Sequence, residues 1–526
     1  MRVDFAITAT CCAVLLSCPL AGRAQQSQTS ALLSKHAEFT GPTAAGATWN
    51  ATGTRTSRGT VDKFTEARRG LLFRDTISTT AGVSDDVGFS GRSVWHADAN
   101  GFTSTLLGPT AQAAIDFDIV RSEAIGSIAG ASLQGNADVR GTRCSILRLA
   151  APGGVPMDLY EDGATGAFLR VVVDPGTAHA QTFEILGYVA TAKGRKVIGE
   201  WSVDNHDYAL TKFDTAGPVL DSAIAPPAPR AMWTYSTQDI PFIYTTETDN
   251  SRQIKINASI NGHAGIFLLS TDAPSIVLYQ PFGSQAGVTD LGTSDFSPYI
   301  GNSQFQGYAR AKTLQVGSAI LRDVVVAQIR APNARIAGVL GYDFLARALV
   351  NVDLQQQRMQ ILDPALYAPT LAAGAYAFPI DLTDHTPAIA MQLPKGGYAF
   401  PTLDTGLSGF MILSQQLSDS RQIEGAAIND VATIGFGGLG PTGDPIASIG
   451  MQITYISWNT ATTSGSCVRV PLIQIGPYKY ANPPLCFGGS NIFGENRGLI
   501  GMDFLRHFNW TIDYPDARFT LTPNGV

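Results

Sequence analysis

The sequence predicts a mainly β protein in which an N-terminal antiparallel sheet domain is followed by two tandem β lobes. Three observations carry this prediction. Short apolar runs alternate with Gly, Asp, Asn and Thr, as in Phe168–Asp174, which is typical of antiparallel strands joined by tight turns. A segment rich in Ala and Pro, 216–237, divides the chain. Beyond this linker the sequence repeats itself.

Composition and charge narrow the classes of function. The chain has 526 residues, enough for two or three domains of roughly 150 residues each, and its 54 glycines suit a turn-rich fold. Lys and Arg total 36 against 43 Asp and Glu, so the net charge is −7, and no long basic run is present. We therefore expect no nucleic-acid partner. We place the N-terminal β-rich domain at 30–215.

Residues 1–24 have the features of a signal peptide. Arg2 supplies a positive start, Phe5–Leu20 is apolar and uncharged, and Gly22–Ala24 offers a small-x-small cleavage site. A membrane-spanning helix is the competing interpretation, but the apolar run is shorter than the roughly 20 residues that such a helix needs. Cleavage predicts an exported protein, periplasmic or secreted, with no integral membrane span. Lipoprotein-type processing, which would leave Cys18 lipidated and the protein anchored, is the second option.

Cysteine usage predicts one disulfide. Cys467 and Cys486 are close enough in sequence to pair across a short loop in an oxidising compartment, which leaves Cys144 free. The other three cysteines lie in the leader. No Cys or His spacing matches a zinc site, so we expect neither a metal nor a cofactor.

The region beyond the linker contains an internal repeat. Val339–Leu345 and Leu499–Leu505 share the pattern apolar-apolar-Gly-x-Asp-Phe-Leu. Each copy continues with an apolar strand, an acidic residue and a basic residue that opens a final strand. A gapless match of this kind indicates tandem duplication. The matched positions, each pair 160 residues apart, are Gly341 with Gly501, Asp353 with Asp513, and Arg358 with Arg518.

Each copy also contains a strand, a hairpin turn, a second apolar strand and a Thr-containing polar loop. In the second copy the loop is Asp404–Gly406, with the sequence Asp-Thr-Gly, and it follows the apolar run Phe400–Leu403. Aligned on the preceding strand, the first copy has Ser270–Asp272, with the sequence Ser-Thr-Asp. These two loops are the candidate chemical centre.

With these features the repeated region resembles the aspartic peptidases of the pepsin and retropepsin type, in particular their two-lobed exported bacterial forms. The resemblance implies two acid-protease-like lobes, at 238–365 and 374–524. In that family each lobe donates one aspartate to a dyad, and the two carboxylates share one proton because both cannot ionise side by side. One acts as a base toward a water molecule while the other protonates the peptide carbonyl.

The resemblance assigns roles to individual residues. Asp404 matches the catalytic aspartate and Thr405 the residue that hydrogen-bonds across the lobes. Gly406 matches the position where the backbone turns tightly beside the carboxylate. Gly341 and Gly501 match the strand that crosses behind each loop.

The first lobe departs from the family pattern. Ser270 stands where the aspartate is expected, Thr271 keeps the cross-lobe role, and Asp272 occupies the glycine position. Three interpretations follow. The site has one carboxylate and is severely impaired, or a rearrangement brings Asp272 to Asp404 as the second catalytic acid, or a homodimer pairs the second lobes so that each contributes Asp404.

Other motifs are assigned no chemistry. Gly435–Gly440 matches G-x-G-x-x-G, but Pro441 and Pro445 follow, so a phosphate-binding helix is not expected to start there. We expect a hairpin instead, in the interval where the family has the flap that closes over substrate. Asp343 and Asp503 are expected to cap short helices.

The N-terminal domain has no catalytic signature. It resembles lipoprotein-carrier-like half-barrels, which implies a curved antiparallel sheet that binds an apolar chain or supports the lobes. The residues that carry this resemblance are Gly91–Trp95, Asp98, Gly101, Pro156–Tyr160, Ala164–Gly166 and Leu169–Arg170.

The leading hypothesis for function is an aspartic-type endopeptidase that acts on a peptide or protein substrate. The rival is a non-catalytic protein that holds an extended peptide in the same place by strand addition. A lipid or lipoprotein carrier that works through the N-terminal sheet is the third hypothesis.

Overall fold

The fold is known from a computed structural model. Among the residues that it describes, no helix is both long enough and apolar enough to cross a membrane. Most of the predicted signal peptide lies outside the described residues. These are 18–41, 48–57, 60–106, 108–122, 125, 130–150, 155–176, 180–191, 194–203, 206–214, 217–244, 253–293, 305–331, 334–367, 371–382, 385–407, 409–427, 436–439, 445–446, 467–488 and 497–525.

The chain folds into two compact units. The first comprises Met1–Ile77, Val87–Val94 and Leu107–Ala225, and the second comprises Ser78–Asp86, Trp95–Leu106 and Pro226–Val526. The second unit therefore contains the repeated region together with two short segments from before residue 107. The sequence analysis had placed those two segments in the N-terminal domain.

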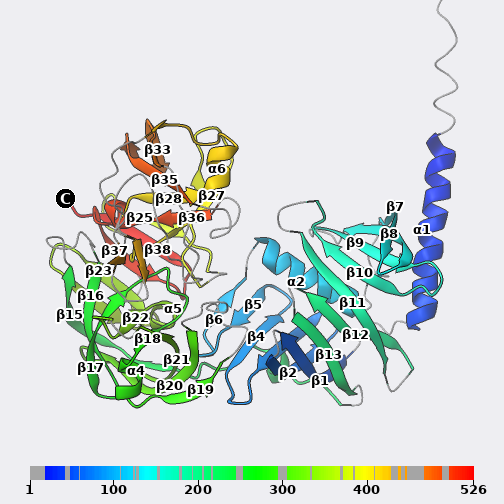
Figure 1. The fold of residues 1–526 in the computed structure, drawn as a ribbon, viewed down its shortest axis with the longest axis horizontal. Helices are drawn as coiled ribbons and strands as arrows, with labels where there is room; N and C mark the ends of the chain where they lie inside the picture. The colour runs from blue at the N-terminus through cyan, green and yellow to red at the C-terminus, as the bar shows by residue number, and fades with distance from the viewer. Residues whose placement is uncertain are drawn as a thin grey trace, which may run out of the picture. The chain divides into compact units, whose positions relative to one another are not determined.

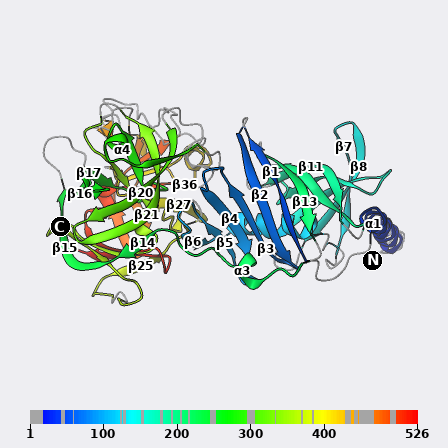
Figure 2. The same cartoon turned by 90° about the horizontal axis from the view of Figure 1, so that it is seen from below.

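The first unit is a curved antiparallel sheet with helices beside it, as Figures 1 and 2 show. Neighbouring strands follow the order β3-β2-β1-β13-β12-β11-β10-β9-β8-β7. This confirms the predicted half-barrel-like sheet. The elements are α1 (Cys18–Thr40), β1 (Thr48–Ser57), β2 (Thr60–Arg69), β3 (Leu72–Ser78), α2 (Gly108–Arg121), β7 (Ser132–Val139), β8 (Thr142–Ala150), β9 (Pro156–Asp162), β10 (Phe168–Val173), β11 (Gln181–Ala190), β12 (Lys196–Val203), β13 (His206–Asp214) and α3 (Asp221–Ile224).

Helix α2 is held on the sheet by both apolar and ionic contacts. Phe117 of α2 stacks on Phe183 at 3.7 Å between ring centroids. Arg68 of β2 makes two hydrogen bonds to the carboxylate of Asp118, and Arg121 bonds Glu66. A buried charge is costly unless it is paired, so this ionic network anchors α2 to β2.

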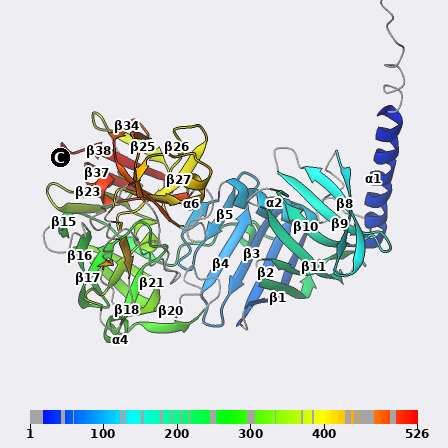
Figure 3. The same ribbon diagram turned by 45° about the horizontal axis from the view of Figure 1, so that its top comes forward.

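The second unit contains the two tandem β lobes that the repeat predicts (Figure 3). Its early segments are the first half of β4 (Ser84–Phe89), β5 (Val94–Ala97) and β6 (Thr103–Thr105). The first lobe comprises β14 (Met232–Thr234), β15 (Ser236–Tyr244), β16 (Ile254–Ile260), β17 (His263–Leu269), β18 (Val277–Gln280), α4 (Phe282–Gln285), β19 (Thr289–Gly292), β20 (Phe305–Val316), β21 (Ala319–Arg330), β22 (Gly338–Leu340), α5 (Tyr342–Leu345), β23 (Leu349–Asp353) and β24 (Arg358–Leu362). The second lobe comprises β25 (Tyr376–Pro379), β26 (Met391–Gln392), β27 (Tyr398–Leu403), β28 (Met411–Ser414), α6 (Gln415–Asp419), β29 (Ala426–Ala427), β30 (Phe436–Leu439), β31 (Pro445–Ile446), β32 (Cys467–Arg469), β33 (Leu472–Ile475), β34 (Tyr478–Ala481), β35 (Pro484–Gly488), β36 (Arg497–Ile500), α8 (Met502–Leu505), β37 (Phe508–Asp513) and β38 (Arg518–Pro523).

Both lobes place a crossing strand in the same way. In the first lobe β22 lies between β17, to which it is parallel, and β18, to which it is antiparallel. In the second lobe β36 lies between β27 and β28 with the same two directions. The duplication seen in the sequence is therefore a duplication of topology.

The lobes share a central sheet in the order β15-β24-β23-β37-β38-β25. Strands β23 and β37 pair antiparallel at its middle, where Asn351 lies opposite Thr511. These two residues occupy the same position in the two copies of the repeat, so the lobes are related by an approximate twofold axis. The segment predicted to be a linker is not wholly irregular, because it contains α3 and β14.

Candidate active site

Each candidate loop begins where a central strand of its lobe ends. After β17, Ser270 donates its backbone N–H to Leu340 O of the crossing strand at 3.1 Å. After β27, Asp404 donates its backbone N–H to Ile500 O at 2.8 Å. The same bond in both lobes places Ser270 and Asp404 at equivalent positions.

A glycine at the end of each crossing strand leaves room for the loop. A Cβ on Gly341 would lie 2.4 Å from the carbonyl oxygens of Ala273 and Ser275. A Cβ on Gly501 would lie 2.4 Å from Gly409 O. Real Cβ atoms do not approach oxygen so closely, so these contacts require glycine at both positions.

Reciprocal hydrogen bonds between two threonines join the loops. Thr405 Oγ1 donates to Leu269 O at 3.0 Å and accepts the N–H of Thr271 at 3.1 Å. Thr271 Oγ1 donates to Leu403 O and accepts the N–H of Thr405 at 3.0 Å. Both threonines are fully buried. Each lobe therefore supplies hydrogen-bond partners to backbone groups of the other lobe, and these bonds hold the two loops against each other.

The carboxyl group of Asp404 is buried at this junction, with the residue only 5% exposed. Its Oδ1 accepts the N–H of Gly406 at 2.7 Å. Burial raises the pKa of Asp404 to about 7, although hydrogen bonds from the N–H groups of Gly406 and Leu407 and from the Ser270 hydroxyl act in the opposite direction. Asp404 can therefore exchange a proton near neutral pH.

Ser270 lies against Asp404, and Asp272 is the second acidic residue of the junction. The Ser270 side chain is buried and hydrogen-bonds the Asp404 carboxyl. Asp272 is half-buried, and its charge acts on Tyr514 as the charge of Asp404 does. Burial raises the pKa of Tyr514 well above its ordinary value, and the charges of Tyr342, Asp272 and Asp404 raise it further. Both acids therefore act on the same buried tyrosine.

The arrangement limits the chemistry that this site can perform. One carboxyl with a pKa near 7 can take a proton from water when it is ionised. A serine hydroxyl can donate a hydrogen bond to that carboxylate but does not ionise in the working range, so the pair Ser270–Asp404 does not share a proton as two carboxyls do.

The second lobe contains the predicted disulfide. Cys467 and Cys486 form the disulfide and lie opposite each other on β32 and β35. Cys144 is a buried free thiol. Within the Gly-rich motif, 436–439 forms β30, which pairs antiparallel with β31. Residues 428–435, 440–444 and 447–466 of the flap interval lie outside the described residues.

Two residues beside the first loop were not selected from the sequence as site residues. Asp343 was expected to cap α5, but Gly341 occupies the N-cap, and the Asp343 carboxylate accepts the N–H of Ile276 at 2.9 Å. His385 of the second lobe hydrogen-bonds the backbone of Pro274. No motif marks His385, so only the tertiary structure reveals it.

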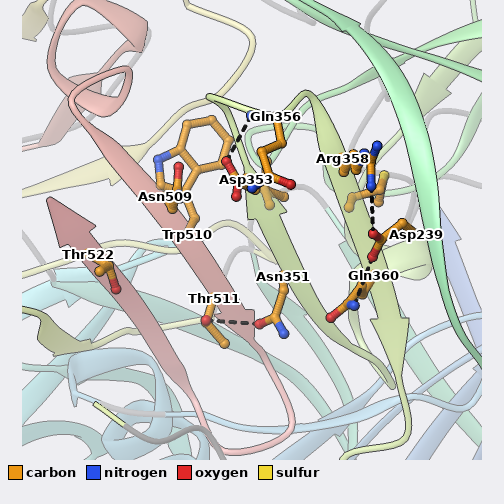
Figure 4. A pocket seen from close by; sticks show the side chains of 12 residues that line it. Asp239, Asn351, Asp353, Gln356, Arg358, Gln360, Asn509, Trp510, Thr511 and Thr522 are labelled. Atoms are coloured by element: carbon orange, nitrogen blue, oxygen red, sulfur yellow. Dashed lines mark hydrogen bonds and ion pairs between the residues drawn. The ribbon is translucent and has the colours of Figure 1, made fainter. Parts of the chain in front are cut away.

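A separate pocket of about 350 Å³ lies on the central sheet. Figure 4 shows Thr511 and Asn351 facing each other there, with a hydrogen bond of 2.9 Å from Thr511 to Asn351. Asp239 bonds both Arg358 and Gln360 at another side of the pocket. None of the candidate catalytic residues lines it, so we do not assign it to the same site.

Among the described residues, no cluster of three or more His, Cys, Asp or Glu side chains is arranged to hold a metal ion.

Comparison with known proteins finds similar solved structures, three of which are distant likenesses. No family model matches the chain, and no curated protein matches it. Among solved structures it is similar to a DUF1329 family protein from Desulfovibrio piger, with 13% identity, a TM-score of 0.27, and coverage of 38% of this chain and 97% of that one. A domain described as an outer membrane lipoprotein-sorting protein from Vibrio parahaemolyticus matches with 8% identity and a TM-score of 0.22, covering 37% of this chain and 95% of that one.

A retropepsin-like aspartic protease from Rickettsia conorii is also similar, with 14% identity and a TM-score of 0.19. The match covers 25% of this chain and 96% of that one. At such TM-scores these likenesses carry no argument about function, which rests on the geometry of the junction.

Proposed function

We propose that the junction of the two lobes is a weak aspartic-type endopeptidase site in which Asp404 is the only catalytic carboxyl. Ionised Asp404 takes a proton from a water molecule as that water attacks the peptide carbonyl, and it returns the proton to the amide nitrogen when the C–N bond breaks. Ser270 donates its hydroxyl to the carboxylate and orients it. Because no second acid protonates the carbonyl, hydrolysis is slow compared with a site that has two carboxyls.

The observation that supports this proposal most is the reciprocal bonding of Thr271 and Thr405. It brings the equivalent loops of two duplicated lobes together, with Asp404 and Ser270 beside it. A structural role alone does not require a buried carboxyl at that point, since burial of an ionisable group opposes folding.

Two other arrangements of the site remain as alternatives. Asp272 as the second catalytic acid requires the first loop to rearrange, because Ser270 occupies the place against Asp404. A homodimer that pairs two second lobes would have to break the Thr405–Thr271 bonds within each chain. Both alternatives would therefore break contacts that exist within the single chain.

A second candidate function is peptide binding without hydrolysis. The Ser270–Asp404 hydrogen bond favours it, because the position of the second acid is filled by a hydroxyl that does not ionise in the working range. The carrier hypothesis gains less support, since the face of the N-terminal sheet under α2 carries the buried ions Glu66 and Arg68 of β2, which pair with Arg121 and Asp118 of the helix. We also propose that the leader 1–24 directs export of the protein. The same proposal places the two lobes at 238–365 and 374–524.

Peptide-library cleavage between pH 3 and 8 tests the proposal. The mature wild-type chain is compared with Asp404→Asn, and Asp516→Asn serves as a matched control because its side chain is 66% exposed on a turn of the same lobe. We expect slow cleavage by wild type and the control, and none by Asp404→Asn. Equal cleavage by all three refutes the enzyme, whereas saturable binding without cleavage supports the second candidate.

A further inference from the structure

The β5–β6 hairpin, residues Trp95–Leu106, belongs to the unit of the lobes although it precedes them by more than 100 residues in sequence. Strands β5 and β6 pair antiparallel, with His96 opposite Ser104. Asn100 in the turn donates its side-chain N–H to Val325 O at 2.9 Å and accepts the N–H of Val325 at 2.7 Å. Phe102 is 1% exposed and belongs to the hydrophobic core of the lobes. The hairpin is thus docked on the lobes by both backbone and core contacts.

We propose that this hairpin is a proton-dependent brace of the candidate active site, in which His96 and Asp98 are positioning residues for the loop that carries Ser270. The link to catalysis rests on the proposed function, whereas the docking of the hairpin does not. Two chains of hydrogen bonds, one from each of these residues, carry the proposal.

The first chain runs from the hairpin through two histidines to Pro274. His96 Nε2 lies 2.7 Å from Asp85 Oδ1, and His96 Nδ1 lies 3.2 Å from His385 Nε2. His385 hydrogen-bonds the backbone of Pro274. Proline has no N–H, so its carbonyl oxygen accepts this bond and His385 must donate it.

Counting protons along this chain assigns the charge of His96. His385 donates one N–H to Pro274, so in its neutral form its Nε2 carries a lone pair and accepts. His96 Nδ1 must then carry a proton, and His96 Nε2 must carry another to bond the carboxylate of Asp85. His96 is therefore a cation, and all bonds of the chain are made only while it stays protonated.

The second chain runs from Asp98 through Asp343 to Ile276. Asp98 Oδ1 accepts the N–H groups of Asn100 at 2.8 Å and Phe102 at 3.0 Å. Asp98 Oδ2 is buried and has no amide, hydroxyl or cationic donor among the described groups. The carboxyl of Asp343 hydrogen-bonds Asp98 and the side chain of Asn100, and its Oδ2 accepts the N–H of Ile276. Two carboxyl groups can bond each other only if they hold a proton between them.

Both chains end on the same loop. Pro274 and Ile276 follow the stretch Ser270–Asp272, and each is held by a lobe residue that is in turn held by the hairpin. His385 also has φ 61°, a backbone conformation that residues with a Cβ seldom adopt, and its ring stacks on Tyr342 at 4.3 Å. The hairpin therefore fixes two backbone anchors of the loop that carries Ser270.

The sign of the pH dependence follows from the groups that face the two chains. Burial alone lowers the pKa of His96, but the carboxylates of Asp85, Asp98 and Asp86 outweigh it and raise the pKa above 6.5. Burial raises the pKa of Asp98 to about 6, and burial together with Asp98 raises that of Asp343 well above 3.8. The surrounding titratable or charged groups are Asp85, Asp86, Tyr342, Asp343, Arg347 and His385.

A group whose pKa is raised by docking stabilises the docked state at low pH, and this stabilisation is lost as the pH rises through the raised value. His96, Asp98 and Asp343 all act in this sense. His385 acts in the opposite sense, because burial and the charge of His96 lower its pKa from 6.5 to about 3, so it opposes docking below pH 6.5. Above pH 6.5 His385 is neutral and no longer opposes docking. Docking then weakens because the docked state holds up to two protons that the undocked state releases, one on His96 and one between Asp98 and Asp343.

Hydrogen exchange of the full chain between pH 5 and 8.5, corrected for the intrinsic pH dependence of exchange, measures docking directly. We expect protection of the peptides covering 95–106 and 270–276 to fall together above pH 6.5, by up to about a hundredfold per pH unit for two protons. In Asp98→Asn the amide donates to ionised Asp343, so one proton is no longer needed and the fall becomes about tenfold per unit.

His96→Phe keeps a ring but loses both hydrogen bonds, and it should lower protection of both peptides at pH 6 by at least about tenfold. His263→Gln, an exposed histidine of β17, is the matched control and should leave protection unchanged. The same pH slope in Asp98→Asn as in wild type overturns the proposal. So does a hairpin that opens while the 270–276 peptide stays protected. Exchange does not depend on cleavage, so an inactive but braced protein refutes the proposed function alone.

Discussion

Thr271→Val probes the lock between the lobes with little change of shape. Thr271 Oγ1 donates to Leu403 O and accepts the N–H of Thr405, and valine can do neither. A buried backbone group that loses its partner costs about 1–3 kcal/mol. Both lost bonds lie in a fully buried place, so the substitution should destabilise the lobes by about 2–6 kcal/mol.

Pulsed hydrogen exchange across a urea series, read on peptides covering 253–280 and 398–407, gives the unfolding midpoint of the lobes separately from the rest of the chain. Thr271→Ser is the matched control because it keeps the hydroxyl and loses one buried methyl group, which costs about 1 kcal/mol. If valine costs no more than serine, the reciprocal threonine bonds do not hold the lobes together and the reasoning fails.

Three further predictions follow from other contacts. Burial raises the pKa of Asp404 from 3.8 to about 7, so its contribution to stability is complete below pH 3.8 and is lost as the pH rises through 7. Asp404→Asn should therefore be more stable than wild type at pH 8, by up to about 4 kcal/mol, and equal urea midpoints at pH 8 contradict this. Gly501→Ala places a Cβ 2.4 Å from Gly409 O and should cost about 1–3 kcal/mol or more, whereas Gly163→Ala, which meets open space, should cost little in the same melting experiment. Arg68→Met removes the hydrogen-bond partner of the buried Asp118 carboxylate and one of the two arginines that bond Glu66, so it should destabilise the first unit by about 3–5 kcal/mol; the urea midpoint read on peptides of β1–β3 checks this, and a loss below about 1 kcal/mol refutes it.

The duplicated lobes could be predicted because the repeat is a long-range signal within the sequence. The spacing of Gly341 and Gly501 places the crossing strand in both copies, and the strand before each loop sets the register that aligns Ser270 with Asp404. Such equivalences survive because the same backbone packing has to be built twice.

The docking of the β5–β6 hairpin could not be predicted in the same way. Its strands are short, and His385 and Asp343, which bond His96 and Asp98 from the lobes, lie far along the chain. No local sequence pattern therefore predicts these contacts. Asp343 follows the repeat and was taken for a helix cap, because sequence spacing cannot show that its carboxylate bonds Ile276 instead. Tertiary contacts of single polar groups are set by packing rather than by periodicity.

The ion pairs of β2 could not be predicted from the sequence either. Glu66 and Arg68 are charged residues of a type that is usually exposed to solvent. In the fold they lie under α2, where they pair with its Arg121 and Asp118. The pairing partners come from α2, some 50 residues further along the chain, and only the packed structure brings them together.

Ser270→Asp tests the central claim most directly, because it restores the second carboxyl at the position equivalent to Asp404. The measurement is kcat/KM for peptide cleavage by this variant between pH 3 and 8, beside wild type and the double variant with Asp404→Asn. We predict a gain of at least about tenfold at acidic pH, which disappears in the double variant. A folded Ser270→Asp variant without any gain, together with loss of activity in Asp272→Ala, would show that Asp272 rather than position 270 faces Asp404.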